Sequence, residues 1–520
     1  MTAFRKSTTM MSRAATSSNK NKTILSRLTK VWNTFFSNKE SPRNIQERND
    51  LYKIALAVTF HDVRRLKNAT TSNENRNDVD ITAGEDDMSS SRSKGTENGT
   101  ATDIPIVNDN SPPSTNNLIT SQEELEAIFD EAHDILEQKK VYDMSIRGLR
   151  LETQQLLRPQ VSSLLQVFQN TETMVPSTTR LDSEESEEFF MMREANKKRC
   201  CDVLYEEQCQ TLDLLGDNAN HTELEVEGRK VKKNPFLNKK LSAIQTIASF
   251  YEWEHFYFDK SFENIGDGSD ISNNNNDSNA AGADEFGYIQ STDEQVNSSI
   301  RYYQMINLSR SALIRQQIGY SVISLKSTLP NAGRGIFVDG TAPAGSILAF
   351  FPGDVWPKEY LVNSKAIAPY FKKDPRYLLS IRYDDILIDS RKAPYTVLDD
   401  DHSNAFAVAH IVNHPSKVEE PNCSTMAIDF MENMKLNETN IDIFVPNKYK
   451  KKPMMFGPQA MNHDAVMMHS MGLLSSRDIT NEELFYDYRL SPGPDKTFPD
   501  WYHVCNEEEL KNRWHHDNIQ

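Results

Sequence analysis

The sequence predicts an α+β protein, in which a mostly helical N-terminal region precedes a compact domain of short strands. As far as residue 262, apolar residues recur three and four positions apart, which is the spacing of one helix face. From about Tyr320 onward, short β-branched or aromatic runs alternate with turn residues instead. Two polar stretches with few large apolar side chains, residues 68–117 and 263–298, predict disordered linkers.

Composition narrows the class of protein. The chain has 520 residues, enough for two or three domains, and its net charge of -17 argues against direct nucleic-acid binding. The 5 cysteines are odd in number and lack zinc-type spacing, so we expect neither a disulfide framework nor a metal site, and a reduced intracellular compartment. No apolar run reaches the roughly 18 residues that a membrane span requires, so no membrane partner is expected.

The basic N-terminal tail, residues 1–45, has two interpretations. Its first 36 residues contain no acidic side chain, and their apolar residues recur at helical spacing opposite Lys22, Arg27 and Lys30. This pattern is typical of a mitochondrial or plastid transit peptide, and a flexible basic tail with one surface helix explains it equally well. Localisation to the nucleus, the cytoplasm or an organelle is therefore left open.

The helices are predicted from apolar stripes. One stripe, which predicts a helix over residues 46–67, consists of Leu51, Ile54, Ala55, Val58 and Leu66. The helical region 118–262 begins with Ser121 and Glu124 in a capping-box arrangement, ahead of a stripe of Leu125, Ile128, Phe129, Ala132 and Leu136. Further stripes run over residues 189–215 and 241–257.

The strand-rich domain is predicted over residues 299–491, with a helix leading into it and a C-terminal segment, residues 492–520, after it. Its strands are predicted from β-branched and aromatic runs at residues 335–338, 346–351, 386–389, 423–430 and 484–488.

Four short motifs within this domain carry candidate chemistry. The turn Gly333-Arg334-Gly335 precedes a strand and allows the backbone to approach a ligand, although it lacks the third glycine of a dinucleotide site. An apolar strand ends at Phe351, ahead of Pro-Gly. Asn413-His414 precedes a Pro-Asn pair, and Glu483-Leu484-Phe485-Tyr486-Asp487-Tyr488 follows. Individually these motifs are ordinary turns, capped loops and buried strands.

In this order, the four motifs resemble the SET domain of protein-lysine methyltransferases, and the sequence is most similar to the group around SET domain-containing protein 9. The resemblance covers roughly residues 317–514. It implies a β-clip of small sheets with a pseudoknotted C-terminal segment, followed by a short C-terminal helix. It also implies methyl transfer from S-adenosylmethionine to the ε-amine of a lysine in a protein substrate, histone or non-histone.

The resemblance assigns roles to particular residues. Tyr488 matches the catalytic tyrosine, and Phe351 and Tyr486 line the channel for the substrate lysine. The residues implied to bind S-adenosylmethionine are Gly333, Arg334, Gly335, Asn413, His414 and Trp501. A hydroxyl at Tyr486 favours monomethylation in this family.

Two departures from the family pattern leave an alternative open. Pro415-Ser416 stands where the family has Ser-Cys, and Asn481 replaces a glycine, in a turn whose left-handed conformation asparagine also tolerates. The alternative is a catalytically inactive SET-fold protein that acts as a binding or scaffold module. The sequence does not predict the oligomeric state.

Overall fold

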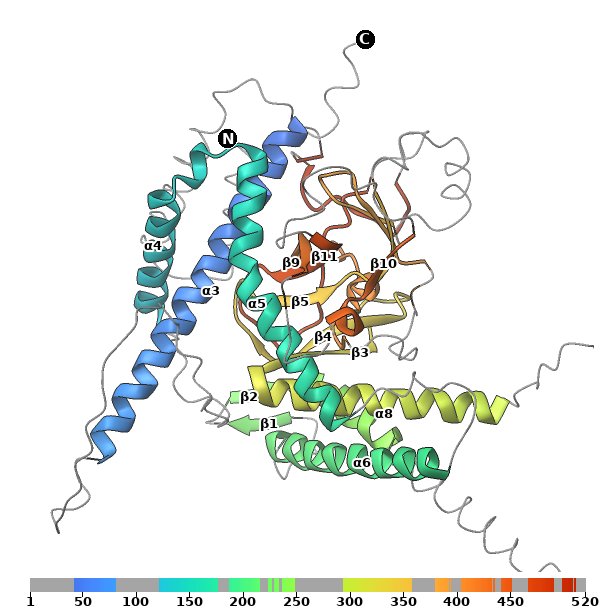
Figure 1. The fold of residues 1–520 in the computed structure, drawn as a ribbon. Coiled ribbons are helices and arrows are strands. Elements are labelled where there is room, and N and C mark those ends of the chain that lie inside the picture. Colours follow the sequence, from blue (N-terminus) through green and yellow to red (C-terminus); the bar gives the residue numbers. More distant parts are fainter. Residues whose placement is uncertain are drawn as a thin grey trace, which may run out of the picture.

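The computed structural model confirms the α+β class, with helices first and small sheets after them (Figure 1). It describes residues 42–80, 121–175, 187–215, 223–226, 229–232, 236–247, 293–357, 379–391, 393, 404–432, 434, 441–450, 466–490, 498–507 and 509–510. The predicted basic tail up to residue 41 and the parts of the linkers at residues 81–117 and 263–292 lie outside this range. No helix within it is both long and apolar enough to cross a membrane.

The first described helix, α3, spans Pro42–Asp80 and is longer than predicted. The prediction of a linker beginning at residue 68 is wrong for residues 68–80, which continue the helix. The predicted stripe is buried from Leu51 to Val58, but Leu66 is 62% exposed and does not belong to it. Beyond that turn the helix extends past the body that it packs against, so periodicity alone placed Leu66 wrongly.

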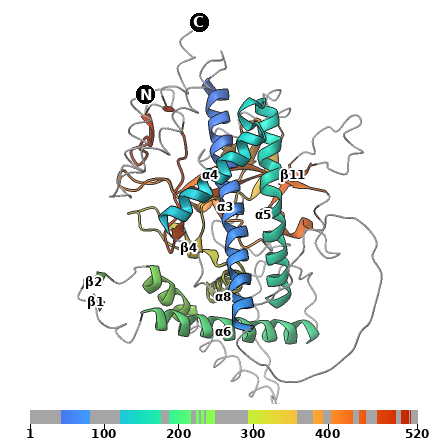
Figure 2. The same ribbon diagram turned by 90° about the vertical axis from the view of Figure 1, so that its left-hand side faces the viewer.

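Helices α4 (Gln122–Gln138) and α5 (Ile146–Met174) are joined by the 3-10 turn η2 (Val141–Asp143). The predicted capping box is confirmed, because the Glu124 backbone N–H donates to Ser121 Oγ at 3.3 Å while Ser121 Oγ donates to the Glu124 carboxylate. Ser145 caps α5 in the same way, through the Gly148 N–H. Helix α3 packs against both α4 and α5, as Figures 1 and 2 show from two directions.

A second group of helices lies across the end of α5. It comprises α6 (Glu187–Leu215), a helical stretch at residues 236–247, and α8 (Asp293–Ile318), which packs on α6. The predicted helical region 118–262 is interrupted by a hairpin of β1 (Glu223–Val226) and β2 (Arg229–Lys232). Residues 293–298, predicted as linker, are the first turns of α8, which leads into the strands.

The described strands after α8 form three small sheets. The first has the order β12-β4-β3 and the second the order β5-β11-β9, and both are antiparallel. The third has the order β10-β6-β8-β7, in which β10 and β6 run parallel. The strands are β3 (Tyr320–Lys326), β4 (Arg334–Ala342), β5 (Ile347–Phe350), β6 (Gly353–Trp356), β7 (Leu379–Ile381), β8 (Leu387–Asp389), β9 (Cys423–Met431), β10 (Asn447–Tyr449), β11 (Val466–Ser475) and β12 (Ile479–Thr480). Two 3-10 turns, η4 (Ala409–Ile411) and η5 (Ile441–Phe444), lie between them.

The helices α3 and α5 share one hydrophobic core with the sheets. Phe168 of α5 meets Phe406 edge to face, with ring centroids 5.3 Å apart. Gly345, in the turn after β4, lies so close to α3 that a β-carbon on it would overlap the Ala57 carbonyl. Gln160 of α5 donates to the Gly345 carbonyl at 3.2 Å. Because this interior is continuous, the helices are part of the body that carries the candidate site.

Candidate functional site

The segment over residues 482–488 is the centre of the site, and it is not the regular strand that the sequence predicts. It forms two single bridges, antiparallel from Glu483 to Phe337 and parallel from Phe485 to Asn413. The backbone of the segment therefore forms hydrogen bonds with β4 on one side and with Asn413 on the other, through single residues rather than a continuous ladder. The segment thus lies between two neighbouring segments and pairs with both.

Asn422 holds the inserted segment in place. Its Nδ2 donates to the Glu483 carbonyl at 2.8 Å, and its Oδ1 accepts from the Phe485 N–H at 2.8 Å. Its own backbone N–H donates to the Phe485 carbonyl at 3.0 Å. Asn422 is only 2% exposed, so its amide replaces a strand partner for backbone groups that are shielded from water. The sequence motif contained this residue, but its pattern did not indicate this function.

Glu483 is a buried carboxylate that joins the glycine turn to Asn413. Its Oε1 accepts from Ser327 Oγ at 2.6 Å and from Asn413 Nδ2 at 3.2 Å. Its Oε2 accepts from the Thr328 N–H at 2.6 Å and from the Thr328 hydroxyl. Sequence reasoning assigned Glu483 no function, because nothing in the motif shows which groups meet its carboxylate.

Glycine is required at the two positions of the turn for different structural reasons. Gly333 has a φ of 70°, a left-handed conformation that favours glycine, and a β-carbon on it would meet nothing within 4 Å. At Gly335 a β-carbon would overlap the Glu483 carboxylate. Gly333 therefore faces open space, whereas Gly335 makes room for Glu483.

Asn413 presents one amide oxygen from this network. Its Nδ2 lies 3.0 Å from the Arg334 carbonyl and 3.2 Å from both Ser327 Oγ and Glu483 Oε1. These acceptors determine which end of the amide is nitrogen. The Oδ1 accepts no hydrogen bond from the described residues, so it can accept one from a ligand N–H group.

Arg334, predicted to bind a cofactor, contributes its backbone to the network rather than its side chain. Its Nε donates to Ser324 Oγ at 2.8 Å, and a second guanidinium nitrogen donates to the Ser324 carbonyl. Burial lowers the pKa of the Arg334 guanidinium. The side chain is thus folded back along β3, while the Arg334 carbonyl faces Asn413.

Three predicted aromatic residues form a continuous row. Phe351 meets Tyr486 edge to face at 5.8 Å, and the Tyr486 and Tyr488 rings are 4.8 Å apart. The Tyr488 hydroxyl donates to the Val412 carbonyl at 2.9 Å. Burial raises the pKa of Tyr486 well above its usual value, so this phenol stays protonated. Its hydroxyl makes no hydrogen bond to a described residue and remains available to water or an amine.

His414 and Trp501 lie at the other end of this row. The buried His414 ring stacks on Tyr502 at 4.5 Å, and the Trp501 ring lies 6.4 Å from it and 6.1 Å from the Tyr488 ring. Burial lowers the pKa of His414, so its imidazole is neutral at physiological pH. Trp501 is 53% exposed and leaves a large part of its indole uncovered.

The structure brings all nine predicted site residues into one contact network. The Gly333 carbonyl accepts from the Ser327 N–H at 3.0 Å, which ties the turn to the Ser327 hydroxyl beside Asn413. Asn413 continues into His414, whose Nδ1 lies 3.4 Å from the Tyr488 N–H. Their individual roles remain predictions. The residues that sequence reasoning missed are Ser327, Val412, Asn422, Glu483 and Tyr502.

A cavity of about 300 Å³ lies beside this network, and none of the nine predicted residues lines it. It shares Thr328 and Glu483 with the network, and its other lining residues include Phe236, Phe337 and Arg477.

Comparison with known proteins adds little to this geometry. No family profile and no curated protein sequence matches the chain. Among solved structures, one match is ctPRC2 in an autoinhibited conformation bound to S-adenosylmethionine, at 17% identity and a TM-score of 0.18. The match covers 39% of this chain and 18% of that one, so this chain corresponds to less than a fifth of its length. A likeness at this level carries no functional argument.

Proposed function

We propose that the chain transfers a methyl group from S-adenosylmethionine to the ε-amine of a lysine in a protein substrate. The observation that carries the proposal is the single network in which Asn413, the Gly333 turn and Tyr488 meet. These residues are 155 positions apart in the sequence at their extremes, Gly333 and Tyr488. The order of the four sequence motifs, which resembles that of the SET domain, supports the same assignment.

The residues present fit the proposed cofactor. The Asn413 Oδ1 is a free acceptor for its amino group, and the open space at Gly333 admits the methionine part. The uncovered face of Trp501, which is 53% exposed, offers a surface for the adenine ring. The chemistry that S-adenosylmethionine supplies there is an electrophilic methyl group on a positively charged sulfur.

The aromatic row prepares the attacking amine. Phe351 and Tyr486, which are 1% and 8% exposed, would keep water away from a lysine that enters beside them. Removal from water favours the neutral form of an amine, and only the neutral form is nucleophilic. The hydrogen bond from the Tyr488 hydroxyl to the Val412 carbonyl fixes the position of the last ring of the row. These residues therefore contribute position and desolvation more than proton transfer.

Calorimetry followed by a transfer assay tests this function. The wild-type chain should bind S-adenosylmethionine, and Asn413→Ala should weaken binding by about tenfold, the effect of one lost hydrogen bond to a charged group. The wild type should also incorporate radiolabelled methyl groups into proteins of a cell extract, and Tyr488→Phe should not. Tyr205→Phe, at a 69% exposed tyrosine, is the matched control and should leave incorporation unchanged.

Two outcomes contradict the proposal. Failure of the wild type to bind S-adenosylmethionine removes the cofactor site. Binding without transfer to any protein of the extract favours the alternative, an inactive SET-fold binding or scaffold module. If transfer occurs, comparison of lysine methylation in cells with and without the intact gene identifies the substrate, histone or non-histone.

A further inference from the structure

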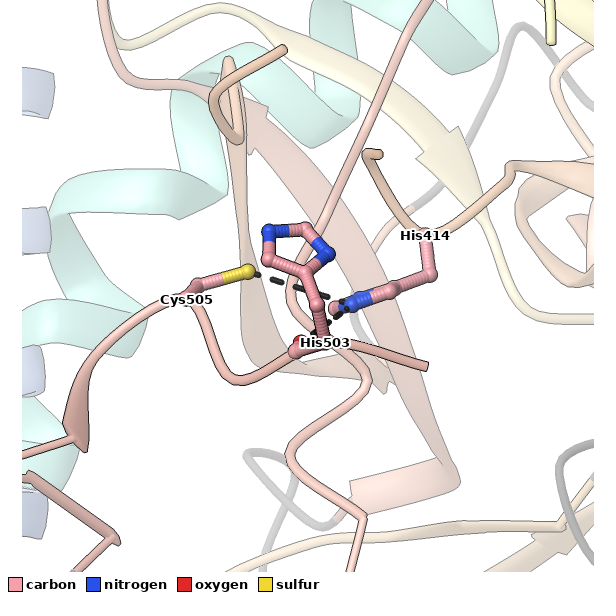
Figure 3. Close-up of side chains that lie close together, drawn as sticks. All are labelled: His414, His503 and Cys505. Carbon is pink, nitrogen blue, oxygen red and sulfur yellow. Dashed lines mark hydrogen bonds between the residues drawn. The ribbon is translucent and has the colours of Figure 1, made fainter. Parts of the chain in front are cut away.

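Three side chains that offer metal-ligand atoms converge where the C-terminal segment meets His414. Figure 3 shows His414, His503 and Cys505 directed towards one another, and one ligand atom of each lies within 4.8 Å of the others. His414 Nε2 and Cys505 Sγ are 4.0 Å apart. We propose that these three residues bind a transition-metal ion, with Zn²⁺ as the best match.

The donor set fits zinc. Two imidazole nitrogens and one thiolate are ligands that Zn²⁺ accepts together, with bonds of about 2.0–2.1 Å to nitrogen and about 2.3 Å to sulfur. Around one tetrahedral ion, such ligand atoms lie roughly 3.2–3.7 Å apart. The 4.0 Å between His414 Nε2 and Cys505 Sγ is close to this spacing, and the pairs that include His503, which lie within 4.8 Å, would also contract on binding. Water would complete the coordination as the fourth ligand.

An unpaired ring nitrogen points to a missing partner at the same place. The Nδ1 of His503 is buried and has no hydrogen-bond partner in the described part of the chain. A buried polar atom without a partner is costly, and native structures contain few of them. A bound cation would give this nitrogen its partner, whereas no neighbouring side chain does so.

His414 can exchange a proton for the ion. Without a metal, a proton on Nε2 makes this nitrogen a hydrogen-bond donor to the His503 carbonyl, 2.8 Å away. With Nε2 bound to a metal, the proton would move to Nδ1, which lies next to the Tyr486 backbone carbonyl and 3.9 Å from Asp487 Oδ1. Nδ1 would then give up the long hydrogen bond, 3.4 Å, that it accepts from the Tyr488 N–H. Histidines that bind metals usually donate their other N–H to a carbonyl or carboxylate placed in this way.

The ion would fasten an irregular segment to the site. Residues 498–506 form neither a helix nor a strand, and their described contacts are largely aromatic, such as Phe498 on Tyr502 at 5.0 Å. This segment carries Trp501. A metal shared by His414, His503 and Cys505 would hold Trp501 against Tyr488. The cysteine spacing predicted no metal site. That prediction did not include histidines, and His414 lies 89 residues before His503.

Metal analysis of the full chain, purified without a histidine tag, tests the site without any transfer assay. After dialysis against metal-free buffer, elemental mass spectrometry should find about one zinc per chain. Cys505→Ser and His503→Phe should each lose it, and Cys209→Ser, at an exposed cysteine, is the matched control that should retain it. Stripped wild-type protein given Co²⁺ should show thiolate-to-cobalt charge-transfer absorption, which Cys505→Ser lacks.

A second measurement uses the wild-type chain alone, so that a variant that fails to fold does not decide the result. Iodoacetamide labelling, mapped by mass spectrometry, should modify Cys505 more slowly in Zn²⁺ than after chelation, with Cys209 labelled equally in both. Wild-type protein without bound zinc and without the cobalt absorption overturns the proposal. Equal labelling of Cys505 in both conditions also overturns it, as does a full zinc content in folded Cys505→Ser.

Discussion

The Glu483 carboxylate occupies the space that a β-carbon on Gly335 would fill. This contact places an acidic group directly behind the glycine turn, where it also accepts hydrogen bonds from Ser327, Thr328 and Asn413. The turn, the Asn413 amide and the inserted segment are thereby held in one rigid arrangement. A substitution that displaces any one of the three is therefore expected to displace the other two.

Replacement of Gly335 by alanine should displace Glu483. We expect a loss of about 1–3 kcal/mol in the free energy of unfolding, as for other overpacked interiors, together with weaker binding of S-adenosylmethionine. Gly148→Ala is the matched control, since its β-carbon would meet Ser145 Oγ at an ordinary 3.4 Å within a helix. Urea denaturation measures both variants. An unchanged midpoint for Gly335→Ala would mean that Glu483 relaxes without cost.

Replacement of Tyr486 by phenylalanine should change the product and leave the fold intact. The Tyr486 hydroxyl has no hydrogen-bond partner among the described residues, so its removal costs little stability and enlarges the space beside the amine. The share of di- and trimethyllysine should therefore rise, as measured by mass spectrometry of a methylated substrate. The same product distribution in wild type and variant would show that this hydroxyl does not limit the methylation state.

The ion pair between Asp50 of α3 and Arg489, next to Tyr488, predicts a pH-dependent contribution to stability. Asp50 Oδ2 lies 2.6 Å from Arg489 Nη1 and 2.5 Å from the Tyr383 hydroxyl. Burial by itself raises the pKa of Asp50, but the Arg489 charge and hydrogen bond outweigh burial and lower it below its usual value. Because the pKa is lowered in the folded state, the stabilisation is present above about pH 4 and is lost as pH falls further.

Asp50→Asn should therefore cost about 1.5–3 kcal/mol at pH 7, the range for a hydrogen bond to a charged group. The difference from wild type should shrink as pH falls below about 4, because Asp50 of the unfolded chain takes up a proton there while Asp50 of the folded chain, with its lowered pKa, does so only at lower pH. Chemical denaturation at several pH values measures it. Glu131→Gln, which breaks the exposed ion pair with Lys67, is the control and should have little effect at any pH. A difference that grows on acidification would contradict the lowered pKa.

Phe168→Ala in α5 tests whether helices and sheets share one core. The Phe168 ring is 1% exposed and packs on Phe406, so its loss should cost about 3–5 kcal/mol. Leu151→Ala, in the same helix at a 58% exposed position, should cost less than about 0.5 kcal/mol. Tryptophan fluorescence and circular dichroism should report one common transition. Two separate transitions would indicate that the helical region folds independently of the sheets.

Local patterns in the sequence were sufficient for much of the fold. The helix start at Ser121 depends on residues three positions apart, and it was predicted correctly. The strands at residues 335–338 and 423–430 were likewise found from side-chain composition, within β4 and β9. Asn481 has a φ of 50°, the left-handed conformation that the sequence predicts for this turn. Helix starts, strand composition and turn conformation depend on residues within a few positions of one another, so the sequence is enough to predict them.

Some predictions failed because local pattern does not reveal what lies opposite a residue. Leu66 continues the helical stripe but has no surface to pack against, and it is exposed. Residues 484–488 have the composition of a strand. Their backbone groups are paired with different segments, β4 and the one that contains Asn413, so no regular strand forms. The hairpin of β1 and β2 within the predicted helical region was missed for a related reason, because its two strands are only four residues each.

The sequence by itself determined that helices come first and short strands after them, and it named nine residues for one site. Only the tertiary structure decided that Glu483 joins the turn to Asn413, that Asp50 reaches Arg489, and that His414 meets Cys505. These pairs lie 70 to 439 residues apart. Periodicity reports only whether a side chain is buried, whereas the choice of partner depends on how the whole chain packs.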